Sequence, residues 1–237
     1  MTIALKAQKI GDLGEMRKSL EAAALKRPND LESLLLLSTL LISNDRKTAE
    51  SRRMLMKVMS SQPSNNLALR ANTALSLASL IDGNLDEAKG HIERALRLDE
   101  KYRPALLNLG TANYLSSEWE EATHIYSALI SSSNRDGEAL LMWAQAQIQL
   151  WKRSKDKSIL EATLDRLEEY LTLDEDYRQE TMLTKSYVHF LLTQYHKAEK
   201  QVQSLLDLDP YFTSEHAKDP LVFRDLVDWD SFLPWCM

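Results

Sequence analysis

The sequence Leu109-Gly110-Thr111-Ala112-Asn113-Tyr114, followed by Glu118-Trp119-Glu120-Glu121-Ala122, decides the fold because it has a counterpart upstream. The counterpart consists of Leu75-Ser76-Leu77-Ala78 and then Asp86-Glu87-Ala88. The first leucines of the two stretches are 34 residues apart, and so are their last alanines. A fixed period of this length indicates an array of similar supersecondary units, each of which buries its apolar face against its neighbours.

Three kinds of position recur along most of the chain. A small residue marks the first half of a unit at Thr39, Ser76, Gly110, Ala144 and Ser186. A close-contact position opens the second half at Met16, Ser51, Ala88, Ala122, Thr163 and Ala198. A large residue follows it at Leu20, Leu55, Ile92, Tyr126, Leu167 and Val202, with spacings of 35, 37, 34, 41 and 35 residues. Pro28, Pro63 and Pro210 end units, because proline disfavours continuation of a helix. The pattern predicts pairs of helices that approach closely at the small side chains.

These residues resemble the tetratricopeptide-repeat (TPR) family. The resemblance implies an all-α fold, a right-handed superhelical solenoid of helical hairpins with a C-terminal capping helix. We expect an array over residues 1–212 and a cap or tail over residues 213–237. The array would hold about five full repeats after a truncated N-terminal one, in which Gly11-Asp12-Leu13 forms a turn. Second helices would begin with capping boxes, namely Asn84 with Glu87, Ser117 with Glu120 and Ser158 with Glu161.

Composition narrows the class of protein. The chain has 237 residues and a net charge of −6, which argues against a cationic surface for nucleic acid. Its single cysteine, Cys236, cannot form an internal disulfide, which fits a reducing compartment. The N-terminus lacks the apolar core of a secretory signal, and the most apolar stretch, residues 31–42, is too short to span a bilayer. We therefore expect a cytoplasmic protein that does not insert into a membrane.

In the TPR family the first helices line a concave groove, and the resemblance projects eleven residues onto it. They are Arg70, Thr73, Leu77, Asn108, Thr111, Tyr114, Leu115, Gln145, Ile148, Tyr187 and Phe190. Only Arg70 and Asn108 resemble the Lys, Arg and Asn side chains with which one subclass binds the C-terminal carboxylates of chaperones. A mainly apolar groove instead suits an amphipathic helix or an extended apolar segment. A sharper hypothesis makes Tyr114, Leu115, Tyr187 and Phe190 a binding stripe, although aromatic residues at helical spacing also serve as core.

Two further segments have alternative interpretations. An insertion around residues 151–158 carries Lys152, Arg153, Lys155 and Lys157, which form either a solvated loop or a docking site for an acidic partner or an anionic lipid surface. The aromatic tail, residues 229–237, either completes the cap, serves as a portable binding tail, or enters the groove of a second copy to form a homodimer.

No pattern indicates catalysis. The five histidines form no HExxH motif, the chain has no phosphate loop and no nucleophile elbow, and His91 and His124 are interpreted as surface residues of second helices. We predict no catalytic residues, no cofactor and no metal. The expected function is a non-enzymatic scaffold or adaptor that holds a protein segment. The alternatives are a chaperone-like assembly factor for a secretion, pilus or other multiprotein complex, and a self-association module.

Overall fold

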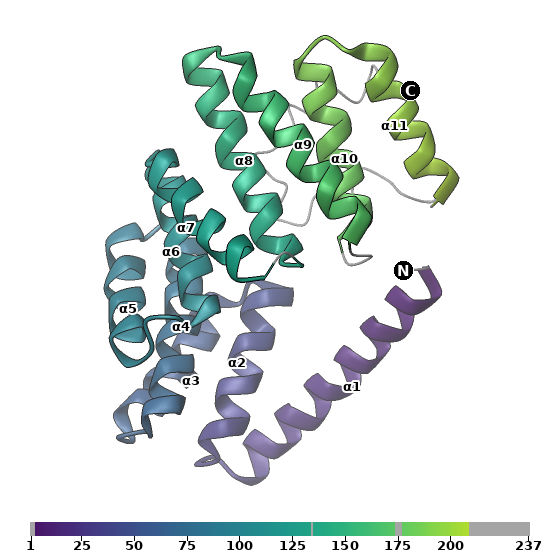
Figure 1. Cartoon of the computed structure of the whole chain (residues 1–237). Helices are drawn as coiled ribbons and strands as arrows, with labels where there is room; N and C mark the ends of the chain where they lie inside the picture. Colours follow the sequence, from purple (N-terminus) through teal and green to yellow (C-terminus); the bar gives the residue numbers. More distant parts are fainter. Residues whose placement is uncertain (1–2, 134, 174–176, 209–237) are drawn as a thin grey trace. The chain divides into compact units, whose positions relative to one another are not determined.

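The computed structural model describes residues 3–133, 135–173 and 177–208, and every regular element within them is an α-helix (Figure 1). The helices are α1 (Ile3–Lys26), α2 (Leu31–Asp45), α3 (Thr48–Ser60), α4 (Asn65–Ile81), α5 (Leu85–Leu98), α6 (Arg103–Leu115), α7 (Trp119–Ser132), α8 (Gly137–Ser154), α9 (Lys157–Leu173), α10 (Arg178–Leu191) and α11 (Tyr195–Leu208). The predicted all-α class is confirmed for this part of the chain. The predicted cap and tail, residues 213–237, lie outside the described residues.

The chain divides after Ser116 into two compact units, the first with α1–α6 and the second with α7–α11. This division falls between α6 and α7, the two helices that contain residues 109–114 and 119–122 of the repeat pattern.

The first unit is built from helical hairpins whose first helices also touch one another. Helix α2 packs with α3 and α4 packs with α5, while α4 also contacts α2 and α6. The core between α2, α3 and α4 includes Leu35, Ile42, Leu55 and Leu75, all of them buried. Burying one such side chain stabilises the folded chain by about 1.5–3 kcal/mol. The first helices therefore form one layer, and α3 and α5 form the layer behind it.

The second unit repeats this arrangement with α8 paired to α9 and α10 paired to α11. Helix α7 packs on α8, and α8 also contacts α10. Tyr126 and Leu167, both predicted as large packing residues, are buried in this unit, and so is Trp143.

The close-contact positions explain how the paired helices come together. Ser51, Ala88, Ala122, Thr163 and Ala198 all have a relative exposure of 0%. Ser76, Gly110, Ala144 and Ser186 at the small positions are buried as well. A larger side chain at these sites would have no space, because protein interiors are close-packed.

The prediction is wrong at one small position, Thr39, and at one close-contact position, Met16. Thr39 is exposed, and its neighbour Ser38 is the buried small residue of α2. Successive helical residues lie about 100° apart, so an error of one position turns a side chain from the core toward solvent. Met16 is also exposed, at 46%, because it lies in the middle of one long helix instead of at the start of a second helix.

That long helix is α1, which runs without interruption through Gly11-Asp12-Leu13. The turn predicted at these residues is therefore wrong. Each glycine costs a helix only about 1 kcal/mol relative to alanine, and Gly11 and Gly14 are outnumbered in α1 by strong helix formers such as Ala, Leu, Lys and Glu. A glycine followed by aspartate is thus too weak a signal to end a helix on its own.

The three capping boxes are also wrong in detail. Asn84 does occupy the cap position of α5, but its side chain makes no capping hydrogen bond. Helix α7 begins after Glu118, and Ser117 lies in the preceding turn with φ 61°. Ser158 is the second residue of α9, where its backbone N–H donates to Asp156 Oδ1 at 3.0 Å.

The predicted insertion lengthens two helices instead of forming a loop. Helices α8 and α9 have 18 and 17 residues, and only Lys155 and Asp156 lie between them. Lys152 and Arg153 occupy the last turn of α8, where positive charge interacts favourably with the helix dipole.

The turn inside a hairpin has the same backbone form in both units. After α4, Gly83 has φ 76°, and the N–H of Asn84 donates to the carbonyl of Ser79 at 2.8 Å. After α10, Thr193 has φ 61°, and the N–H of Gln194 donates to the carbonyl of His189 at 2.9 Å. Both are Schellman-type helix ends, which favour glycine at the left-handed residue.

Candidate interaction surface

The two polar residues expected to grip a partner in the first unit instead join neighbouring first helices. Arg70 of α4 forms an ion pair with Glu32 of α2. Asn108 of α6 donates through Nδ2 to the backbone carbonyl of Thr73 at 3.1 Å and to Ser76 Oγ at 2.8 Å, both in α4. These bonds occupy the groups that a carboxylate would need, which disfavours the binding of a chaperone tail at this face.

The other predicted residues of the first unit differ in accessibility. Thr73 and Tyr114 are buried, and the Thr73 hydroxyl donates to the carbonyl of Leu69 at 2.9 Å. Leu77 and Thr111 are partly buried, and Leu77 packs against the core of α2, α3 and α4. Leu115, at 43% exposure, is the most accessible of the set.

In the second unit, Gln145 and Ile148 of α8 are buried. The Nε2 of Gln145 has no hydrogen-bond partner within the described part of the chain. An unsatisfied buried donor costs about 1–3 kcal/mol. These two residues therefore belong to the packed interior of the unit.

An aromatic cluster links α10 to α11. The rings of Tyr187 and Phe190 are stacked, with centroids 6.4 Å apart and an interplanar angle of 14°. Phe190 also meets Tyr195 of α11 edge-on, at 5.7 Å and 61°. Tyr187 is buried, Phe190 is partly buried, and Tyr195 is 48% exposed. The cluster thus has a rigid buried base and an accessible edge.

Tyr195 was absent from the predicted groove because it opens a second helix, and the groove positions were projected from first helices alone. Its position beside the hairpin turn, two residues after Thr193, is the feature of the sequence that could have placed Tyr195 near Phe190. Tyr187 and Phe190, two members of the predicted stripe, are three residues apart on one helix and stack on each other.

A polar network behind the first-helix layer of the first unit involves His91. Its Nδ1 lies 3.0 Å from Asn72 Oδ1, and only 12% of its side chain is exposed, so the prediction of a surface histidine is wrong here. Burial, together with the nearby Arg94, lowers the pKa of His91.

Arg52 of α3 forms ion pairs with Asp82 and Glu87, at 3.1 and 2.9 Å, and so joins two hairpins. Burial opposes the charge on Glu87, but hydrogen bonds from Arg52 and Ser79 outweigh burial and lower its pKa.

The cations at the end of α8 are engaged with aromatic and acidic groups. The Arg153 guanidinium lies 5.5 Å from the ring centre of Trp119 and pairs with Glu120. The Lys155 ammonium lies 5.0 Å from the ring centre of Trp151. The contacts of Arg153 tie α8 to α7, and that of Lys155 stays within the end of α8, so part of the charge run has a structural role.

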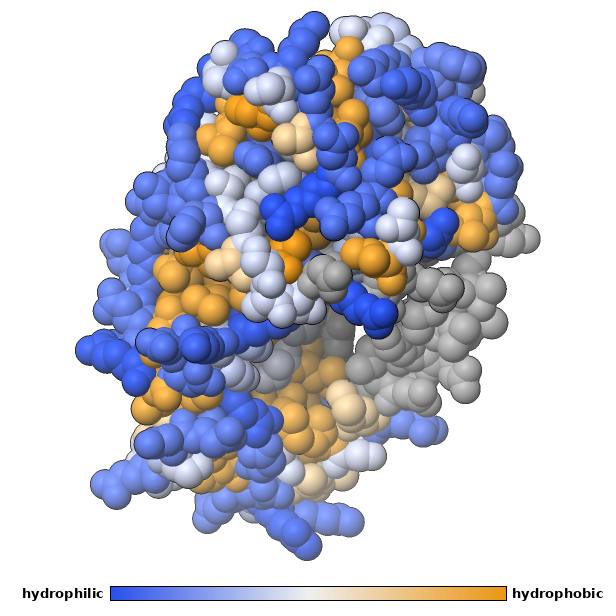
Figure 2. Space-filling model, viewed as in Figure 1, coloured by the Kyte–Doolittle hydropathy of each residue, from blue (hydrophilic) through white to orange (hydrophobic). Residues whose placement is uncertain are grey.

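On the face drawn in Figure 2, hydrophobic residues gather in patches among hydrophilic ones. Among the described residues, no three His, Cys, Asp or Glu side chains gather into a group that could hold a metal ion. None of the described helices is long and apolar enough to cross a membrane.

Comparisons with known proteins give likeness in structure alone. No family model and no curated protein sequence matches the chain. Among solved structures, the crystal structure of YrrB, described as a TPR protein with an unusual peptide-binding site, overlays with a TM-score of 0.52. The two chains are 16% identical, and the match covers 82% of this chain and 94% of YrrB.

A structure of Naa15/Naa10 bound to HypK-THB covers 96% of this chain and 39% of its own, at 16% identity and a TM-score of 0.34, which is too weak to support a conclusion. The overlay with YrrB agrees with the hairpins, the buried small positions and the recurring turn. The chain has the fold of the tetratricopeptide-repeat proteins.

Proposed function

We propose that the chain is a protein-interaction module that holds an apolar or amphipathic segment of a partner. The observation that carries this proposal is the aromatic cluster of Tyr187, Phe190 and Tyr195, whose buried base fixes an accessible edge. Aromatic residues on a rigid support are typical anchors of protein interfaces. YrrB, which shares the fold, is described as having a peptide-binding site.

The chemistry of the predicted groove residues supports an apolar partner over a carboxylate. Arg70 and Asn108 already have partners within the protein, and the accessible members Leu115 and Phe190 are apolar. Within the second unit, a segment with large apolar side chains at helical or extended spacing would complement the edge formed by Phe190 and Tyr195. The buried members, Thr73, Tyr114, Gln145, Ile148 and Tyr187, would act by holding the accessible ones in place.

The test begins with the identification of a partner by affinity purification from the native cell and mass spectrometry. Its affinity is then measured for the wild-type chain and for a Phe190→Ser/Tyr195→Ser double variant. We expect the double variant to weaken binding by about tenfold or more, as for interface anchors. Leu208→Ser is the matched control, because Leu208 lies on α11, is 53% exposed and is outside the cluster. Equal affinity of the folded double variant and the wild type would refute this site.

The partner's behaviour separates the alternatives. An adaptor stays in the final complex and contacts at least two proteins, whereas an assembly chaperone binds one unfolded client and is released from it. A self-association module forms concentration-dependent oligomers without any partner, which analytical ultracentrifugation of the purified chain detects. The scaffold or adaptor role is the one proposed here.

A further inference from the structure

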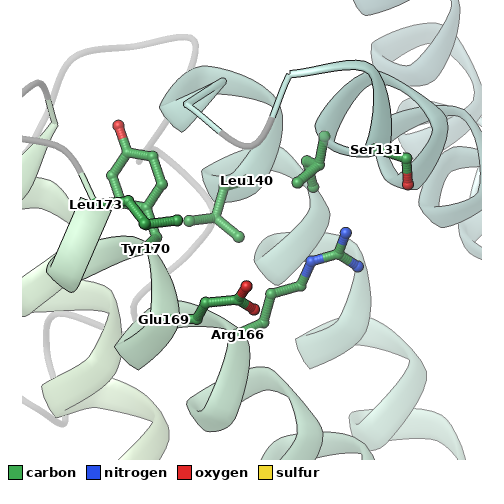
Figure 3. Close-up of a pocket in the computed structure, with 7 residues that line it drawn as sticks. Ser131, Leu140, Arg166, Glu169, Tyr170 and Leu173 are labelled. Carbon is green, nitrogen blue, oxygen red and sulfur yellow. The ribbon is translucent and has the colours of Figure 1, made fainter.

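A pocket of about 200 Å³ opens in the second unit (Figure 3). It is lined by α7 and α9, which supply none of the predicted groove residues, and by Leu140 of α8. Helix α9 supplies Arg166, Glu169, Tyr170 and Leu173, which are spaced so that they share one helix face. Ile130 and Ser131 near the end of α7 and Leu140 of α8 complete the walls. The walls therefore combine apolar side chains with one cation and one anion.

The cation is held in a fixed orientation. The Arg166 guanidinium lies 4.9 Å from the ring centre of Trp143, a buried residue of α8. Stacking of this kind leaves the N–H groups at the edge of the guanidinium free to donate. Within the described residues Arg166 has no ion-pair partner, although Glu169 lines the same pocket.

The Glu169 carboxylate forms no ion pair or side-chain hydrogen bond within the described part of the chain. Figure 3 shows the Arg166 guanidinium directed away from the Glu169 carboxylate, toward the side of the pocket on which Ser131 lies. The pocket thus presents a donor group and an acceptor group of opposite charge, separated from each other and flanked by apolar walls.

From this arrangement we infer that the pocket is a binding site for a zwitterionic α-amino acid with a large apolar side chain. The carboxylate of the ligand accepts hydrogen bonds from Arg166, and its ammonium group donates to Glu169. Charge-assisted hydrogen bonds of this kind are stronger than neutral ones. The side chain of the ligand lies against Leu140, Tyr170 and Leu173. The pocket is smaller than the site of a drug-sized molecule, which measures about 300–1,000 Å³, so its volume suits one free amino acid. This inference is independent of the proposed groove function.

Four probes test the charge requirement directly: leucine, N-acetyl-leucine, leucinamide and N-acetyl-leucinamide. Each is titrated into the full chain labelled with ¹⁵N, and amide shifts of Leu140, Glu169 and Tyr170 are followed. For a ligand of this size we expect leucine to bind with a dissociation constant in roughly the millimolar range. Blocking either charged end should weaken binding by about tenfold, the scale of a charged hydrogen bond. The doubly blocked probe should not bind detectably.

Variants assign the binding to the two charged residues. Arg166→Gln should abolish the advantage of leucine over leucinamide, and Glu169→Gln should abolish its advantage over N-acetyl-leucine. Arg153→Gln is the matched control, because Arg153 also stacks on a tryptophan in this unit but does not line the pocket. All variants are compared with the wild type by thermal unfolding.

Three outcomes would overturn the inference. The first is the absence of shifts at these amides with leucine at tens of millimolar. The second is unchanged binding by a folded Arg166→Gln variant. The third is equal binding of leucine and N-acetyl-leucinamide, which would assign the pocket to an internal peptide segment instead of a zwitterion.

Discussion

At the residue scale, two glycines lie in helices but in opposite environments. A Cβ atom added to Gly90 of α5 would have no heavy atom within 4 Å. A Cβ atom added to Gly137, the first residue of α8, would collide with the phenol ring of Tyr170 and would lie 2.8 Å from a ring carbon of Tyr177. The two positions therefore provide a matched pair in which the same substitution has opposite effects.

We predict that Gly90→Ala raises the free energy of unfolding by about 0.5–1 kcal/mol, because alanine restricts the unfolded chain and favours helix. Gly137→Ala should lower it by about 1–3 kcal/mol, because the ring of Tyr170 must move out of a packed site. Urea unfolding followed by circular dichroism measures both changes. A stabilising Gly137→Ala would show that the two tyrosine rings can shift at no cost.

A second residue-scale prediction concerns pH. Burial lowers the pKa of His91 and of His189 below the ordinary value of 6.5, so each folded residue takes up a proton less readily than it does in the unfolded chain. Stability from these residues is therefore fully present above pH 6.5 and is lost as the pH falls through the lowered folded pKa.

Unfolding free energies at pH 7.5 and pH 5.5 measure this loss. His91→Gln, which cannot be protonated, should reduce the difference between the two values, whereas replacing the exposed His196 by glutamine should not. A wild-type chain that is more stable at pH 5.5 than at pH 7.5 would contradict the sign. The pKa of the Glu87 carboxylate is also lowered, so its stabilising contribution is fully present above its ordinary value of 4.5 and is lost only below this pH range.

At the element scale, the turn between paired helices places different residues in the same left-handed conformation. Gly83 occupies it after α4 and Thr193 after α10, with φ values of 76° and 61°. A β-branched residue is strained there, whereas glycine is not.

Thr193→Gly should therefore stabilise the chain by about 1 kcal/mol, and Gly83→Thr should destabilise it by at least as much. Differential scanning calorimetry of the two variants provides the comparison. Thr181→Gly serves as the control, because Thr181 is a helical residue of α10, where glycine is unfavourable. A loss of stability in Thr193→Gly would mean that the contacts of the threonine side chain outweigh the backbone strain.

The sequence predicts helices better than it predicts surfaces, and the reason is physical. The spacing of small residues such as Ala88 and Ala122, both fully buried, reflects close contact between paired helices. The exposure of Tyr114 or Gln145 instead depends on how a neighbouring helix is rotated about its axis. The residues adjacent to Tyr114 or Gln145 in the sequence do not determine that rotation. The pairing of Arg70 with Glu32, 38 residues away in sequence, was hidden for the same reason.

At the scale of the whole molecule, the two compact units consist of hairpins that contact mainly their neighbours. In such arrays the free energy of unfolding is close to a sum of terms for each repeat and its neighbours. A destabilising substitution therefore affects its own hairpin and the adjacent ones first. Ala122 is fully buried in α7, while Ala128 on the same helix is exposed.

We predict that Ala122→Leu lowers stability by about 1–3 kcal/mol through overpacking, and that Ala128→Leu has little effect. Hydrogen exchange measured by mass spectrometry should show faster exchange first in α7 and in α8, its neighbour within the unit. Helices α2 and α3 should keep their protection. A uniform loss of protection from α2 to α11 would show that the chain unfolds as a single cooperative body.

The stacked cations described above have an optical consequence. All three tryptophans in the described residues lie close to a positive charge: Trp119 near Arg153, Trp143 near Arg166 and Trp151 near Lys155. Indole emission depends on the charge and solvent around the ring, and Trp143 is the buried member of the three. A ligand that draws the Arg166 guanidinium away from Trp143 would change the fluorescence of that ring. The protein therefore carries an intrinsic reporter for its own pocket, readable without any attached dye.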